Sequence, residues 1–109
     1  METIYDKLVR DNIPEIIASN DGIPYTRVLD DEEYWEYLLK KDTEELEEVR
    51  NATSRDELKK ELADKLELIR AMAEFNDYSL EDIIEEADIK REKRGGFQKK
   101  LLLEKVVDK

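Results

Sequence analysis

Apolar residues recur at every third or fourth position over most of the chain, which is the spacing of amphipathic helices. One predicted helix begins at Asp30 or Asp31, either of which can cap it, and runs to about Asn51. The next begins at Ser54, where the sequence SRDE has the pattern of a capping box, and ends near residues 76–77. Because only a few residues connect them, these two helices are expected to pack as an antiparallel hairpin.

A further helix follows directly along the chain. It begins at Ser79, where SLED is again a capping pattern, and its apolar positions continue to Arg94. Gly95 and Gly96 then stop it. The last three predicted helices therefore cover most of residues 30–94.

The two ends of the chain carry weaker patterns. A short helix is predicted near Asn12, because Asn is a good N-cap and Pro14 fits a first turn. Residues 24–29 (PYTRVL) have the composition of an extended segment, and the apolar run within 97–104 is either a strand pairing with them or an arm that packs on another subunit. We predict one domain, residues 1–109, with an all-α fold: an antiparallel bundle of about four helices and two short extended segments.

Acidic residues interrupt the apolar faces of the two longest predicted helices. In the first, Asp42 and Glu45 share a face with apolar neighbours, and Glu48 borders it. In the second, Glu61 and Asp64 share a face with Leu68, Ala71 and Phe75, next to a wholly apolar row, which consists of Leu58, Leu62, Leu66, Ile69 and Ala73.

Carboxylates on apolar faces conflict with burial, since an unpaired buried carboxylate costs several kcal/mol and clustered ones repel one another. A divalent cation resolves the conflict, and magnesium prefers oxygen ligands. The alternative is chance, because 30 of the 109 residues are acidic and other acid-x-x-acid pairs occur in the chain.

Composition restricts the chemistry further. The net charge of −11 disfavours duplex nucleic acid and anionic membranes as partners. The absence of cysteine and histidine excludes disulfides, thiolate nucleophiles and ordinary zinc sites. No apolar run approaches the roughly 20 residues of a membrane span, and the N-terminus lacks a signal-peptide pattern, so we expect a cytoplasmic protein.

Charge is distributed unevenly along the chain. Residues 30–64 contain 14 acidic and 6 basic residues, a net charge of −8, whereas residues 89–109 contain 8 basic and 3 acidic residues, a net charge of +5. The first region suits a metal ion and the second suits phosphate.

Two sequence segments, EELEEV (44–49) and ELADKLELI (61–69), resemble the ExxE…ExxD pattern of the all-α nucleotide pyrophosphohydrolase superfamily, which contains MazG-like and phosphoribosyl-ATP pyrophosphohydrolase-like proteins. YDKLVRDNIPEII (5–17) and KREKRGGF (90–97) resemble the two ends of a small single-domain branch of that superfamily. The resemblance thus covers nearly the whole chain.

The resemblance implies that Glu45, Glu48, Glu61 and Asp64 bind magnesium, or manganese in its place, and that one of them or a nearby acid orients the attacking water. It implies hydrolysis of a nucleoside triphosphate or related nucleotide to the monophosphate and pyrophosphate, in a house-cleaning role. It also implies a homo-oligomer whose site combines helices from two chains. Where many relatives have glycine before the aspartate of ExxD, this chain has Ala63, a small residue that favours helix.

Phosphate contacts are expected from basic residues and from glycines that allow close approach of the backbone. These candidates are Lys7, Arg10, Lys90, Lys93, Arg94, Gly95 and Gly96. Alternatively, the basic residues near the last helix end compensate its dipole, and those near the N-terminus form ion pairs with the acidic surface. Tyr34 and Trp35 could stack on a base, although an aromatic residue on an amphipathic helix is more often part of the core.

Two other functions remain open. One is a nucleotide or metal sensor on the same fold without turnover. The other is an acidic helical interaction protein, whose acids would form a solvated face. Since the predicted helices carry more apolar surface than one small domain can cover, we expect a homodimer or a higher oligomer.

Overall fold

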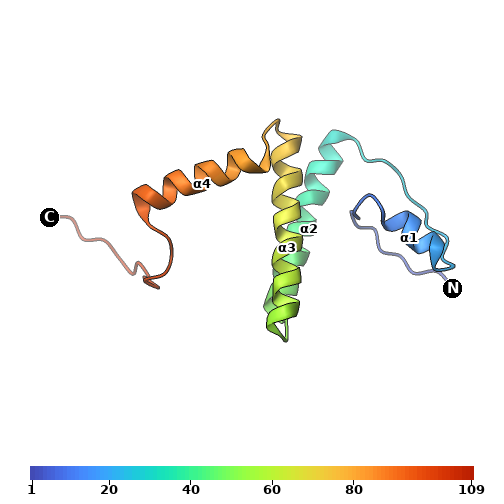
Figure 1. Cartoon of the computed structure of the whole chain (residues 1–109), viewed down its shortest axis with the longest axis horizontal. Helices are drawn as coiled ribbons and strands as arrows, with labels where there is room; N and C mark the ends of the chain where they lie inside the picture. Colours follow the sequence, from blue (N-terminus) through green and yellow to red (C-terminus); the bar gives the residue numbers. More distant parts are fainter.

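The computed structural model describes all 109 residues and contains four helices and no strand (Figure 1). The helices are α1 (Ile13–Ser19), α2 (Asp31–Asn51), α3 (Arg55–Phe75) and α4 (Leu80–Arg94). The all-α fold predicted from the hydrophobic pattern is therefore confirmed. None of these helices combines the length and the apolar character that crossing a membrane requires.

Helices α2 and α3 form an antiparallel hairpin at the centre of the molecule (Figure 1). Its apolar contact includes Leu38 of α2 and Leu68 of α3, which are both buried. At the open end, the Phe75 ring lies edge-on to Tyr34 at 5.2 Å and stacks with Trp35 at 5.9 Å between ring centroids. These half-buried aromatic residues thus pack against one another between the two helices, as is usual for aromatics on amphipathic helices.

The ends of α2 and α3 are capped as the sequence predicts, with one difference. At α2, the Asp30 side chain accepts a hydrogen bond from the Glu33 backbone N–H, and the reciprocal contact is also present. At α3, Ser54 accepts from the Glu57 backbone N–H, but the Glu57 carboxylate accepts from Thr53 instead of the Ser54 backbone. Helix α3 therefore has the Ser54 half of the predicted capping box, while the Glu57 carboxylate binds Thr53, one residue before Ser54.

Helix α4 leaves the hairpin at a sharp turn and extends away from it (Figure 1). Asp77 has a positive φ of 64° in this turn, and Ser79 and Asp82 form a full capping box at the start of α4. The helix ends at Gly95, whose φ of 84° is one that residues with a side chain rarely adopt. The predicted stop at Gly95 is confirmed.

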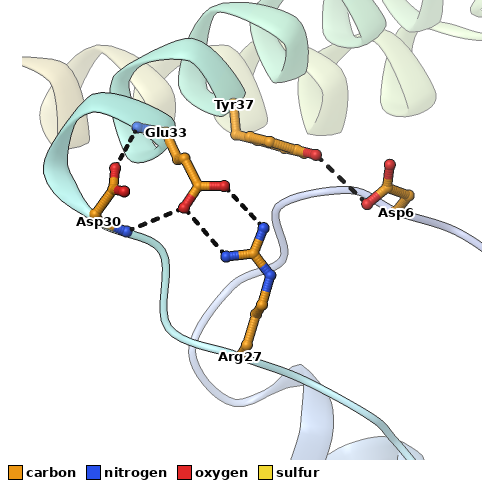
Figure 2. Close-up of polar contacts among 5 residues, drawn as sticks. All are labelled: Asp6, Arg27, Asp30, Glu33 and Tyr37. Carbon is orange, nitrogen blue, oxygen red and sulfur yellow. Dashed lines mark hydrogen bonds and ion pairs between the residues drawn. The ribbon is translucent and has the colours of Figure 1, made fainter.

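Two contacts tie the segments before α2 to that helix (Figure 2). Arg27 donates two hydrogen bonds to the Glu33 carboxylate, at 3.1 and 2.8 Å, and this lowers the pKa of Glu33. The Tyr37 hydroxyl donates to Asp6 at 3.4 Å. The N-terminal segment is thereby held along one side of the hairpin.

The two segments predicted to be extended do not pair. Neither residues 24–29 nor residues 97–104 form a strand, and Figure 1 places them on opposite sides of the hairpin. The strand-pairing alternative for the C-terminal segment is therefore wrong within one chain, because α4 carries that segment away.

Candidate functional site

Three carboxylates meet where α2 and α3 face each other. They belong to Glu45 of α2 and to Glu61 and Asp64 of α3, and one oxygen from each lies within 4.8 Å of the others. The structure thus brings together three of the four acids predicted from sequence. No other part of the chain gathers three such groups.

Helical spacing explains why these acids converge. Glu45 is seven residues after the buried Leu38 and therefore lies on the same face of α2. On α3, Asp64 precedes the buried Leu68 by four residues, and Glu61 precedes it by seven. Each acid is consequently directed toward the partner helix by the same periodicity that directs the core leucines.

Glu45 is the central residue of the group. Only 8% of its surface is exposed, and its Oε2 atom has no hydrogen-bond partner. The pKa of Glu45 is raised to about 7. The largest cause is burial of the carboxylate, the next is a side-chain hydrogen bond with Glu61, and smaller contributions come from the charges of Asp64 and Glu61. The positive charge of Lys41 lowers this pKa. The site therefore contains a buried carboxylate that a bound cation or proton would stabilise.

Arg10 reaches the edge of this group from the N-terminal segment. Its Nη2 atom lies 2.6 Å from Asp64 Oδ1, and both side chains remain partly exposed. From its position in the sequence, Arg10 is expected either to contact phosphate or to form an ion pair with an acid. The structure shows the ion pair, and the acid it selects is itself a candidate metal ligand.

Asp42 was predicted on the same stripe of α2 but does not join the three acids. Lys65 of α3 donates a hydrogen bond to its Oδ1 atom at 2.9 Å. Sequence spacing alone did not identify this pairing, because it depends on the register between the two helices. Asp42 is neutralised within the protein, whereas the Glu45 carboxylate is not.

Glu48, the fourth predicted ligand, lies outside the group and is exposed. It follows Glu45 by three residues and so points about 60° away from it around α2. The pattern ExxE therefore places one acid in the helix contact and the other at its border.

The basic residues divide into two sets. Lys7 lies over the Tyr5 ring, 5.3 Å from its centroid, and lines a cavity of about 220 Å³ beside Tyr37 and Lys40 of α2. The second set is exposed at the end of α4, which extends away from the hairpin (Figure 1). It consists of Lys90, Lys93, Arg94, Gly95 and Gly96. Within one chain, none of this second set pairs with the three acids.

The three acids fit a hard divalent cation. Carboxylate oxygens are the ligands that magnesium and manganese accept, and the free Oε2 atom of Glu45 is a polar atom that such an ion would satisfy. The Arg10 guanidinium also brings a positive charge to these acids, but it contacts Asp64 rather than Glu45. The arrangement can therefore hold a metal ion at the contact between α2 and α3.

Comparison with known proteins identifies a relative but no family. An uncharacterized protein of Mycolicibacterium smegmatis is 48% identical to this chain over 50 residues, which are 46% of this chain and 51% of that protein. The matched region thus spans about half the length of the relative. No protein-family model matches the chain, and no solved structure matches it.

Proposed function

We propose that this chain is a magnesium-dependent nucleoside triphosphate pyrophosphohydrolase of the MazG-like type, which removes unwanted nucleotides in the cytoplasm. The observation that carries the proposal is the buried Glu45 carboxylate, whose Oε2 atom has no partner, beside Glu61 and Asp64. A protein that used its acids only as a solvated surface would gain nothing from burying one of them unpaired.

Glu45, Glu61 and Asp64 would hold the metal. Glu48 is the fourth acid of the proposed set, since it lies one helical turn beyond Glu45 and about 60° around α2 from it. When bound, magnesium supplies charge neutralisation for the phosphate oxygens. An acid of this group that is not occupied as a ligand accepts a hydrogen bond from the attacking water and so orients it.

The basic residues of the N-terminal segment would bind the phosphate chain. Arg10 lies 2.6 Å from Asp64, so a phosphate near the acids lies within reach of its guanidinium, which can donate two parallel hydrogen bonds. Lys7 lies in the same segment, three residues before Arg10. The residues at the α4 end are proposed as phosphate contacts only for a site to which a second chain contributes.

The alternative function is a sensor that binds metal and nucleotide on the same fold without turnover. Every contact described above serves both functions, so only a measurement of products separates them. The third hypothesis, an acidic interaction protein, does not account for the position of Glu45 between two helices.

The experiment that tests the proposal is an assay of products from a panel of canonical and modified nucleoside triphosphates. Monophosphate and pyrophosphate are separated by chromatography after incubation with magnesium, with manganese, or with chelator. Metal-dependent monophosphate formation supports the enzyme and ranks its substrates. Absence of any product, together with a rise in melting temperature on addition of magnesium and nucleotide, would favour the sensor instead.

A further inference from the structure

A single chain leaves far more surface exposed than its size requires. Its radius of gyration is 18.5 Å, whereas a compact chain of this length has a value of about 13 Å. Its accessible surface is 10384 Å², compared with about 6,300 Å² for a compact monomer of this mass. The excess is of the size that large obligate interfaces remove from water.

Part of this surplus is an apolar face on the α2–α3 hairpin. It is lined by side chains that remain 40–52% exposed: Leu39, Leu46, Leu62, Leu66 and Ile69. At 100° per residue, these side chains lie about 80–160° around each helix from the buried Leu38 and Leu68. Because the two helices are antiparallel, the same rotation turns both sets toward the same side of the hairpin.

The polar contacts agree with this placement. Asp42 and Lys65 join the two helices on the side of the apolar face. Arg10 contacts Asp64 from the opposite side, where the N-terminal segment runs. The N-terminal segment therefore does not cover the apolar face, whose five side chains stay 40–52% exposed in a single chain.

The C-terminal segment, residues 97–107, has complementary properties. Its six large apolar side chains are 75–96% exposed: Phe97, Leu101, Leu102, Leu103, Val106 and Val107. The region that contains it, residues 89–109, has a net charge of +5, and the region that contains most of the hairpin, residues 30–64, has a net charge of −8. The segment thus matches the hairpin both in apolar character and in charge.

The segment cannot reach the hairpin of its own chain along the observed path. Helix α4 has 15 residues, so it is about 22 Å long, and it extends away from the hairpin before the segment begins (Figure 1). This path does not limit the C-terminal segment of a second copy of the chain in its approach to the hairpin.

We propose that the apolar face of the α2–α3 hairpin is covered by the C-terminal segment of a second copy of this chain, in a reciprocal dimer. Each copy then contributes one hairpin and one arm, which satisfies the self-complementarity of a two-fold assembly. The proposal requires no turnover and is therefore tested independently of the proposed function.

The first test is the mass of the full chain in solution, measured by light scattering after gel filtration. The wild-type chain is expected to have the mass of a dimer. Leu66→Lys on the hairpin and Leu102→Lys on the arm should each shift the population toward monomer at equal concentration. Val28→Lys adds the same charge at an exposed aliphatic position in the connection before α2 and should leave the dimer intact. A monomeric wild-type chain, or a dimer unaffected by both variants, would overturn the proposal.

A cross-linking test covers the case in which a lysine variant unfolds. The chain has no cysteine, so Leu66→Cys and Leu102→Cys each introduce a single thiol. When chains carrying the two variants are mixed and treated with a short bismaleimide, a linked pair that contains one of each is expected. A linked pair from Leu66→Cys alone, without the mixed product, would mean that two hairpin faces meet directly and would contradict the arm exchange. Val28→Cys mixed with Leu66→Cys is the control for random collision.

Discussion

Replacing Glu45 with glutamine should stabilise the metal-free protein at neutral pH and prevent its stabilisation by magnesium. The substitution keeps the size of the side chain and removes its charge. In the structure, the pKa of Glu45 is raised to about 7 from 4.5 because the carboxylate is buried beside Glu61 and Asp64. The protein therefore has to ionise a group in a place that disfavours the charge.

The sign and the size follow from linkage. Between pH 4.5 and about 7 the folded protein binds the Glu45 proton more tightly than the unfolded chain does, so the free energy of unfolding falls as pH rises. Below pH 4.5 Glu45 is protonated in both the folded and the unfolded state, so it does not lower the free energy of unfolding. Above about pH 7 Glu45 is ionised in both states, and the free energy of unfolding is lower by about 3 kcal/mol, at about 1.4 kcal/mol per pKa unit.

The measurement is urea unfolding followed by circular dichroism at several pH values between 4.5 and 8, at one protein concentration and in the presence of chelator. The wild-type chain should lose up to about 3 kcal/mol across this range relative to Glu45→Gln. Glu36→Gln is the matched control, because this exposed glutamate on α2 has no ion-pair partner. Added magnesium should stabilise the wild-type chain and the control but not Glu45→Gln.

Two results would refute this reasoning. If Glu45→Gln destabilises the chain at pH 8 without metal, the carboxylate is not strained by burial. If magnesium stabilises Glu45→Gln as much as the wild-type chain, the ion binds elsewhere or does not need this residue.

Three further predictions concern activity. Glu61→Gln and Asp64→Asn should each lower magnesium-dependent turnover by at least about a hundredfold, because each removes one metal ligand, while circular dichroism shows unchanged helicity; full activity in both would exclude the site. Arg10→Ala should raise the Michaelis constant for nucleoside triphosphates about tenfold, as expected for loss of a charged hydrogen bond, whereas Arg27→Ala, whose guanidinium contacts Glu33 instead, should not. Arg94→Ala should also raise that constant, and an unchanged value in steady-state kinetics would place this arginine outside the site.

The hydrophobic pattern and the capping residues were sufficient to predict the helices. Asp30, Ser54 and Ser79 each accept a backbone hydrogen bond at the start of a helix, and Gly95 ends the last one. These interactions are local, within three or four residues, so the sequence contains all the information that they need.

The C-terminal segment could not be predicted in the same way. Its run of leucines is compatible with a strand or with an arm, and the choice depends on where α4 carries it. That direction is set by the turn at Asp77, whose positive φ leaves no signal in the hydrophobic periodicity. The wholly apolar row on α3 is a similar case, because its periodicity does not show which of its residues the same chain covers: Leu62, Leu66 and Ile69 are exposed in one chain.

The candidate site was predicted in part for a similar reason. Periodicity alone directs Glu45, Glu61 and Asp64 toward the contact between the helices, and the structure brings them together. Periodicity does not show which acids find a basic partner. Lys65 pairs with Asp42 and Arg10 pairs with Asp64, and both choices depend on helix register and on the path of the N-terminal segment.

The position of Glu45 separates the functional hypotheses more clearly than the number of acids does. A hairpin stabilised by Leu38, Leu68 and the Phe75 cluster would be more stable with an apolar residue in place of Glu45. A residue that opposes the stability of its own helix pair is expected at a functional site, where a ligand compensates the cost. For an acidic interaction surface, the acids that matter are the exposed ones, and Glu45 would have no reason to be buried. The stability of Glu45→Gln with and without magnesium therefore decides between a metal site and an acidic surface before any substrate is known.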